Sequence, residues 1–168
     1  MSLNIFTVMK DFELPEMPEI MGGNSGFEFS PVQLVSSIPQ AIDGLVTTAI
    51  PMVGSTTFMD GYATANTLSY NEASEQTRAG TIYKVSVKGF YPKASAAMIS
   101  LFAEMVRQKF ILLVTEISGE KLIFGNKNEP LSFNFSKSSK NAPGERSGYD
   151  FEFSGTLTSP APYYSVVS

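Results

Sequence analysis

Three residue types are missing from this 168-residue chain: cysteine, histidine and tryptophan. Without cysteine there is no disulfide, no thiolate metal site and no cysteine nucleophile. Without histidine the chain also lacks the commonest general base and the commonest metal ligand of proteins. An enzyme would depend on carboxylates, lysine, serine or tyrosine, and no spacing in the sequence singles out such a set. We therefore expect neither catalysis nor a cofactor or metal site.

Basic residues are scarce at the start of the chain. Residues 1–60 contain one cation, Lys10, against seven acidic residues, whereas residues 61–168 contain eleven cations against nine acids. The net charge is −4 and the isoelectric point is near 4.9. A nucleic-acid-binding surface needs clustered lysine and arginine to neutralise phosphates. The composition therefore disfavours DNA or RNA as a bound partner.

Long apolar runs are absent as well. No stretch approaches the ~18 uninterrupted apolar residues typical of a membrane-spanning helix, so we expect no membrane insertion. The first twenty residues, MSLNIFTVMKDFELPEMPEI, lack the basic start and apolar segment of a secretory signal. These absences favour a protein that is made and used in a cytoplasm, or in an assembly built there.

Two segments between residues 124 and 155 alternate apolar with polar side chains, on either side of a polar run at 136–148. The apolar positions are Leu131, Phe133, Phe135, Tyr149, Phe151 and Phe153. Because side chains alternate across a strand, two such strands paired antiparallel place all six groups on one core-facing side. The polar run between them is then expected to be a connecting loop and not a site of chemistry.

One amphipathic helix is predicted after Pro92, with Ser95 as its N-cap. Its apolar face consists of Met98, Leu101, Phe102, Met105 and Val106, which recur at three- and four-residue spacing. The opposite face is expected to hold Ser100, Glu104, Arg107 and Gln108. A methionine-bearing stripe of this kind is typical of core filling.

The remaining segments predict strands at 27–38, 44–53, 109–117 and 120–125, with a turn at Ser118–Gly119. Residues 67–70 and 81–90 are typical of the two arms of a hairpin. The polar residues between them, 71–80, are too many for a tight turn and are expected to project as a loop. This order predicts an α+β, mainly β fold: an antiparallel sandwich or open barrel with one flanking amphipathic helix.

The chain is expected to form a single domain, 1–168. Prolines and glycines interrupt residues 10–26, which indicates that residues 1–26 form an extended N-terminal arm. Residues 159–168, which carry two further prolines, are expected to lie as a C-terminal strap on the surface. The arm either rests on its own domain or reaches a neighbouring subunit.

The order of elements along the chain is a hairpin with a polar excursion (67–90), a short amphipathic helix (91–108) and a buried strand leading to a hairpin (109–124). The motif GNKxxPL (125–131) follows, and then the strand YDFEFSG with SPAPYY after it. Over residues 58–164 this order resembles that of small tail structural proteins of bacteriophages and related contractile injection systems.

The resemblance implies a subunit that forms rings or a tube around a channel by joining its sheets and loops to those of its neighbours. Its partners would be further copies of itself and neighbouring tail, neck or baseplate proteins, with DNA only as passing cargo. It would reside in the virion tail, assembled in the cytoplasm of a bacterial host. An acidic channel would let DNA slide without sticking.

A different class of protein fits the same composition: a monomeric β-rich module that binds a carbohydrate or a lipid. This alternative predicts a pocket that bears exposed tyrosine or phenylalanine. The assembly predicts instead exposed apolar residues on strand edges and loops that become ordered only in the oligomer. It also predicts that charged residues of the extensions make subunit contacts. The candidates are Glu72, Glu75 and Arg78 in the excursion, Lys137, Lys140 and Arg146 in the basic loop, and Asp11, Glu13 and Glu16 in the acidic arm.

Overall fold

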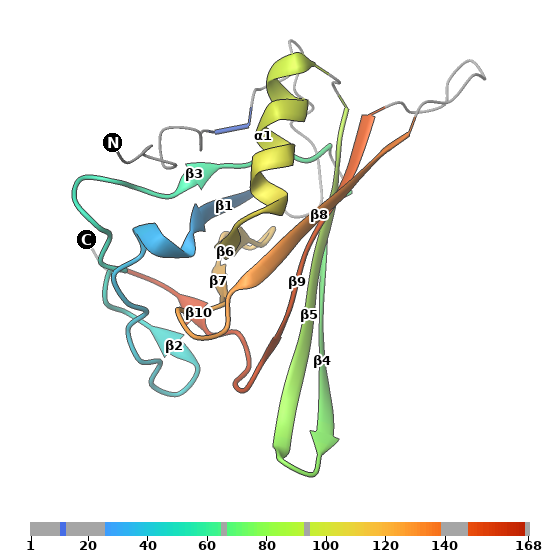
Figure 1. Cartoon of the computed structure of the whole chain (residues 1–168). Helices are drawn as coiled ribbons and strands as arrows, with labels where there is room; N and C mark the ends of the chain where they lie inside the picture. Colours follow the sequence, from blue (N-terminus) through green and yellow to red (C-terminus); the bar gives the residue numbers. More distant parts are fainter. Residues whose placement is uncertain (1–10, 13–25, 65–66, 93–94, 139–147, 167–168) are drawn as a thin grey trace.

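The computed structural model describes residues 11–12, 26–64, 67–92, 95–138 and 148–166 of the chain (Figure 1). The strands are β1 Gly26–Pro31, β2 Leu45–Val46, β3 Met59–Asp60, β4 Ser69–Thr77, β5 Gly80–Tyr91, β6 Lys109–Thr115, β7 Lys121–Phe124, β8 Leu131–Ser138, β9 Gly148–Leu157 and β10 Tyr163–Tyr164. Helix α1 spans Ala96–Val106, and a short 3-10 helix, η2, spans Val32–Leu34.

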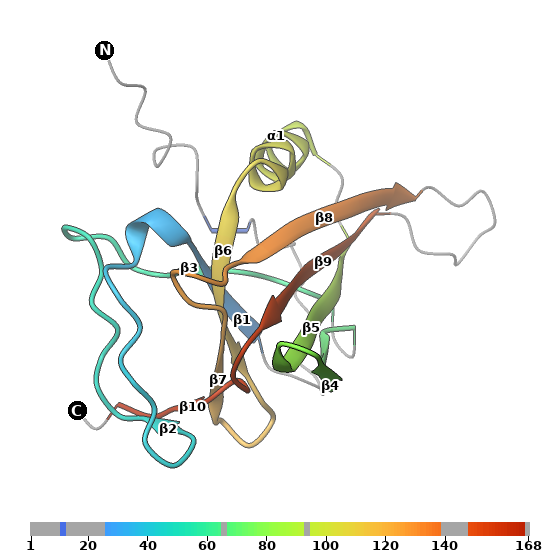
Figure 2. The same cartoon turned by 60° about the horizontal axis from the view of Figure 1, so that its bottom comes forward.

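The strands form one open sheet that does not close into a barrel, with the order β2-β10-β7-β6-β8-β9-β5-β4. Strand β6 is shared between two partners on one side, because Leu112–Thr115 pair with β7 while Lys109 and Phe110 pair with β8. Beyond that point β8 pairs with β9, and the sheet bends so that its two halves face each other (Figures 1 and 2). The predicted fold class, mainly β with one flanking helix, is confirmed.

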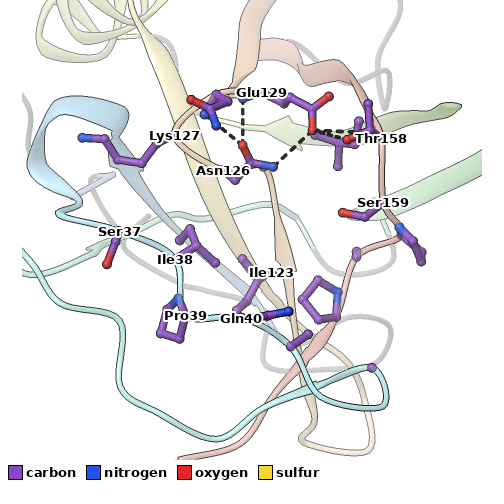
Figure 3. A pocket seen from close by; sticks show the side chains of 18 residues that line it. Ser37, Ile38, Pro39, Gln40, Ile123, Asn126, Lys127, Glu129, Thr158 and Ser159 are labelled. Carbon is purple, nitrogen blue, oxygen red and sulfur yellow. Dashed lines mark hydrogen bonds between the residues drawn. The ribbon is translucent and has the colours of Figure 1, made fainter. Parts of the chain in front are cut away.

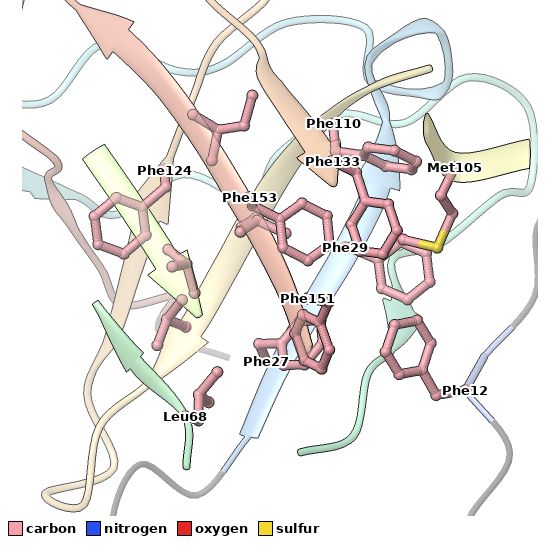
Figure 4. Close-up of a cluster of buried hydrophobic side chains, with 14 of the residues drawn as sticks. Phe12, Phe27, Phe29, Leu68, Met105, Phe110, Phe124, Phe133, Phe151 and Phe153 are labelled. Carbon is pink, nitrogen blue, oxygen red and sulfur yellow. The ribbon is translucent and has the colours of Figure 1, made fainter. Parts of the chain in front are cut away.

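The core lies between the two halves of the sheet and is dominated by aromatic rings (Figure 4). Phe27 of β1 lies 5.5 Å from Phe151 and 5.8 Å from Phe153 of β9, measured between ring centroids. The predicted pairing of the two amphipathic strands is confirmed: Phe133 faces Phe153 and Phe135 faces Phe151 across the strands. Of the six predicted core groups only Phe135 is partly exposed.

Helix α1 begins as predicted, since the Ser95 side chain accepts a hydrogen bond from the backbone N–H of Met98. Four of the five predicted apolar positions are buried, but Val106 is 45% exposed. Gln108, expected on the solvent side, is only 7% exposed. The helix ends at Val106 and the chain turns at once into β6, so the helical period no longer decides which side these last residues face.

Residues 71–80 were expected as a loop, and this prediction is wrong. Strands β4 and β5 pair from Ser69 opposite Lys88 to Thr77 opposite Gly80, and Arg78 and Ala79 alone form the turn. The sequence signal failed because this part of the hairpin extends past the core, where neither face needs apolar residues. For the same reason β8 continues through Lys137, which was expected in the loop but pairs with Tyr149.

Two other strand predictions were too long. Strand β1 ends at Pro31, and the segment 44–53 contributes only β2 to the sheet. The C-terminal segment predicted as a strap contains β10, which lies between β7 and β2 and is parallel to β2. Of the predicted N-terminal arm, the structure describes Asp11, Phe12 and Gly26.

Candidate functional site: an open-edged sheet layer and its hairpin

The hairpin of β4 and β5 is the most prominent projection of the molecule (Figure 1). All residues from Ala73 to Gly80 are exposed. The turn is held by the Thr77 hydroxyl, which donates to the carbonyl of Gly80 at 2.6 Å and accepts from the N–H of Ala79 at 3.3 Å. Gly80 has a φ of +123°, a conformation that residues with a side chain rarely adopt. A polar, two-stranded extension therefore stands out from the body.

Two carboxylates fix the base of this hairpin to the rest of the protein. The Tyr70 hydroxyl donates to Glu116, next to the β6–β7 turn, at 2.5 Å. The backbone N–H of Ala161 donates to the carboxylate of Glu72 at 2.8 Å. Glu72, which was predicted to contact a neighbouring subunit, thus accepts a hydrogen bond from its own chain, and the subunit contact stays a prediction.

The hydrogen bond to Glu116 raises the pKa of Tyr70 to about 12, and partial burial acts in the same direction. The hydroxyl must keep its proton to donate, so its contribution to stability is complete below pH ~10 and is lost as the pH rises toward 12. We expect Tyr70→Phe to lower the free energy of unfolding by about 1 kcal/mol at pH 7. Denaturant titrations between pH 7 and 11 should show this difference shrinking above pH 10; a difference that is constant with pH would contradict the assignment.

The outer face of the layer β8-β9-β5-β4 is polar. Its cross-strand rows include Asn71, Ser86, Ser154 and Ser132, one residue from each strand. The charged groups on this face form two ion pairs, Lys84 with Glu75 at 2.8 Å and Lys88 with Glu152 at 3.7 Å, and Asp150 lies beside them. The face thus carries nearly balanced charge, in contrast to the acidic character of the whole chain.

This layer has an open edge on each side. β4 is the last strand in the sheet order. On the other side, β8 pairs with β6 only at Leu131 and Ser132, so within the described chain its residues 133–138 have no strand partner on that edge. Edge strands have backbone N–H and C=O groups without a ladder partner, which can pair with another strand. Helix α1 packs against β8 on the side away from β9, so β4 is the less covered of the two edges (Figures 1 and 2).

The structure separates the predicted contact residues into groups. Glu75 and Arg78 are exposed on the projecting hairpin, and Lys137 is exposed near the far end of β8. Asp11 lies elsewhere, beside β3, where its carboxylate accepts from the N–H of Asp60. Glu13, Glu16, Lys140 and Arg146 lie outside the described residues, and so does most of the predicted basic loop.

Three acidic residues meet near β3. Asp60 lies opposite Glu28 across β1 and β3, its N–H bonds to Asp11, and Lys121 forms an ion pair with Glu28 at 3.1 Å. Partial burial raises the pKa of Asp60, the neighbouring carboxylates raise it further, and Lys121 opposes them. Among the described residues no group of acidic side chains is arranged to hold a metal ion.

Like charges placed directly opposite on two strands destabilise a sheet. Because the folded-state pKa of Asp60 is raised, ionisation of Asp60 weakens the fold as the pH rises through that value. We therefore expect Asp60→Asn to increase stability at pH 7 by a few tenths of a kcal/mol, since the group is exposed and screened. Thermal unfolding at pH 4 and pH 7 tests this: the gain should be smaller at pH 4, and a loss at pH 7 would contradict it.

A groove of about 850 Å³ lies between the segments 37–41, 125–129 and 157–162 (Figure 3). Its polar side chains largely serve the fold. The Glu129 carboxylate accepts from the N–H and the hydroxyl of Thr158, and Asn126 accepts from the N–H groups of residues 128 and 129. Lys127 donates to the carbonyls of Val32 and Val35. No residue in the described lining is aromatic.

Sequence reasoning missed three features of these sites: the strand character of 71–77, the bond between Tyr70 and Glu116, and the burial of Phe12. Only the burial of Phe12 could have been suspected from the sequence, because Phe12 is an aromatic residue beside the acidic, proline-containing part of the arm.

In comparison with known proteins, no family model, no curated protein and no solved structure matches the chain. In the part of the chain that the structure describes, no helix has the length and apolar character needed to cross a membrane.

Proposed function

We propose that this protein is a structural subunit of a bacteriophage tail or a tail-like assembly, and that its copies form rings or a tube around a channel. In this role its partners are further copies and neighbouring tail, neck or baseplate proteins, and DNA is only passing cargo. It would act in the virion tail after assembly in the host cytoplasm. The role is structural, with no catalytic step.

The observation that carries the proposal is the four-stranded layer with two open edges. Each neighbouring pair in β8-β9-β5-β4 is antiparallel. Because the number of strands is even, β4 of one copy and β8 of the next run in opposite directions when the copies stand side by side. The joined sheet then continues its antiparallel alternation, and a head-to-tail contact of this type forms a ring where its rotation closes and a helical filament where it does not.

The shape of the subunit supports one orientation of such a ring. Helix α1, β1 and β6 all pack on the inner side of the layer, through rings such as Phe27 and Phe102 against Phe151. In a closed ring the side of the layer that carries α1, β1 and β6 needs more space, and there is more space on the outside of the ring. The opposite, polar face of the layer would then line the channel. Its Ser, Asn and paired Lys–Glu side chains offer DNA few fixed charges to bind.

The ligand-binding alternative is less well supported. It predicts a pocket with exposed aromatic rings, whereas the groove of about 850 Å³ is lined by aliphatic, proline and polar residues. A second hollow of about 460 Å³, on the face that carries Lys88 and Glu152, does include Phe135 and Phe151 in its lining, but Phe135 is only partly exposed and Phe151 is buried. Saturable binding of a sugar or a lipid by a strictly monomeric protein would favour it over the assembly.

The deciding experiment is the mass of the purified protein in solution, with negative-stain electron microscopy of the same sample at increasing concentration. The proposal expects rings or tubes with a central hole. A species that stays monomeric at the highest concentration reached would overturn it.

A further inference from the structure

Phe12 is part of the hydrophobic core although it belongs to the N-terminal arm. It is only 4% exposed. Its ring centroid lies between 5.2 and 5.9 Å from those of five other aromatic residues. These five residues, Phe27, Phe29, Tyr91, Phe102 and Phe151, are called the Phe12 socket below. Figure 4 shows Phe12 beside three of them, Phe27, Phe29 and Phe151. Such a ring buried among aromatic side chains is a strong anchor, since a buried aromatic side chain removes a large apolar area from water.

Two hydrogen bonds complete the anchor, and both use the backbone of Asp60. The N–H of Phe12 donates to the carbonyl of Asp60 at 2.8 Å, and the N–H of Asp60 donates to the Asp11 carboxylate at 2.7 Å. The site therefore selects an acidic residue followed by an aromatic one. Nothing in these contacts depends on which copy of the chain supplies the dipeptide.

The tether between the anchor and β1 is much longer than an intramolecular connection requires. The rings of Phe12 and Phe27 are 5.5 Å apart, yet residues 13–25 separate Phe12 from Gly26. Thirteen residues can span about 43–47 Å when extended. That reach exceeds the radius of gyration of about 15 Å expected for a domain of this size, so the socket of a neighbouring copy is accessible.

We propose that in the assembled protein Asp11 and Phe12 of one copy occupy the Phe12 socket of the next copy. The inference rests on the proposed assembly, which holds a second socket within reach. The contacts are the same in both arrangements, so the exchange itself costs little. In a free copy the tether holds the anchor at a high effective concentration near the copy's own socket, and a ring presents the neighbour's socket at a comparable concentration.

Because the chain contains no cysteine, every thiol in a cross-linking experiment is one that was introduced by substitution. Asp11 and Asp60 are exposed and lie within hydrogen-bonding distance of each other. A tagged chain with Asp11→Cys and an untagged chain with Asp60→Cys are co-expressed, assembled and treated with a short thiol-specific cross-linker. We expect a cross-linked product that contains one chain of each type. The double variant Asp11→Cys/Asp60→Cys should give a ladder of linked chains on a denaturing gel.

A matched control replaces Asp60→Cys by Ser36→Cys, an exposed position outside the socket, and should give no product. The inference is overturned if the double variant yields only single chains with an internal link and the mixture yields no product. Electron microscopy of the same samples reports assembly separately. Rings in which every cross-link is internal to one chain would contradict the exchange of Phe12 between copies but not the proposed function. A lack of any rings or tubes would contradict the proposed function itself.

Discussion

Replacing Phe102 by alanine is expected to lower the free energy of unfolding by about 3–5 kcal/mol. Phe102 is fully buried in helix α1, and its ring contacts six other aromatic rings, from the arm, from β5 and from both amphipathic strands. Its removal leaves a cavity where these elements meet. Because the surrounding rings belong to different strands, they cannot all move in to fill the space.

Equilibrium unfolding in urea, followed by circular dichroism, measures the loss, and the melting temperature should fall by roughly 6–20 °C. Ile99→Ala provides the matched control on the exposed side of the same helix, where the side chain is 45% exposed. This control should change stability by less than ~1 kcal/mol. A similar loss in both variants would mean that helix propensity, and not the aromatic core, sets the stability.

The second prediction concerns assembly and not folding. Replacing residues 75–82 by the dipeptide Asn-Gly shortens the hairpin to its base, because Ser74 lies opposite Tyr83 and an Asn-Gly turn suits two strands at that separation. The removed part is almost wholly exposed, so the subunit should fold with nearly unchanged stability. It also carries part of the open edge of β4. We therefore expect rings or tubes to be lost while the circular dichroism spectrum and the melting temperature stay close to those of the parent.

The control for this variant keeps the hairpin at full length and changes only its turn, by Arg78→Asn with Ala79→Gly. If the strand edge joins the copies, this control still assembles. Failure of the control as well would assign the contact to Arg78. Normal assembly of the shortened variant would show that the hairpin edge is not required.

The parts of the fold that sequence predicted best are those where a buried face enforces a period. The alternation of Phe133 and Phe135 with polar residues, and of Phe151 and Phe153, predicted both strands and their shared core face. The spacing of Met98, Leu101, Phe102 and Met105, together with Ser95, predicted the helix and its start. In each case burial on one side makes any shift of one residue costly, so the pattern is strict.

The rest escaped prediction for the complementary reason. Residues 71–77 form a strand in which backbone pairing alone holds the chain, so no apolar period marks it. The hydrogen bond between Tyr70 and Glu116 joins residues 46 positions apart. The residues of the Phe12 socket come from three strands, β1, β5 and β9, and from helix α1. Such contacts depend on how distant segments are arranged in the fold, and the local sequence pattern of one segment does not indicate that arrangement. Of the predicted contact residues, Glu75, Arg78 and Lys137 are exposed. Glu72 and Glu75 also have partners within the chain, the backbone N–H of Ala161 and the ammonium group of Lys84.

The two open edges of the layer are staggered, and this has a geometric consequence for any ring. Ser132 of β8 shares a cross-strand row with Asn71 of β4, so the open part of β8 extends toward one end of the layer and that of β4 toward the other. For the two edges to pair along their full length, each copy must be shifted along the strand direction by about five residues, which is roughly 17 Å. Each copy adds four strands to the circumference, which is roughly 19 Å. The ratio corresponds to strands tilted by about 41° from the ring axis, within the 35–45° at which closed barrels settle.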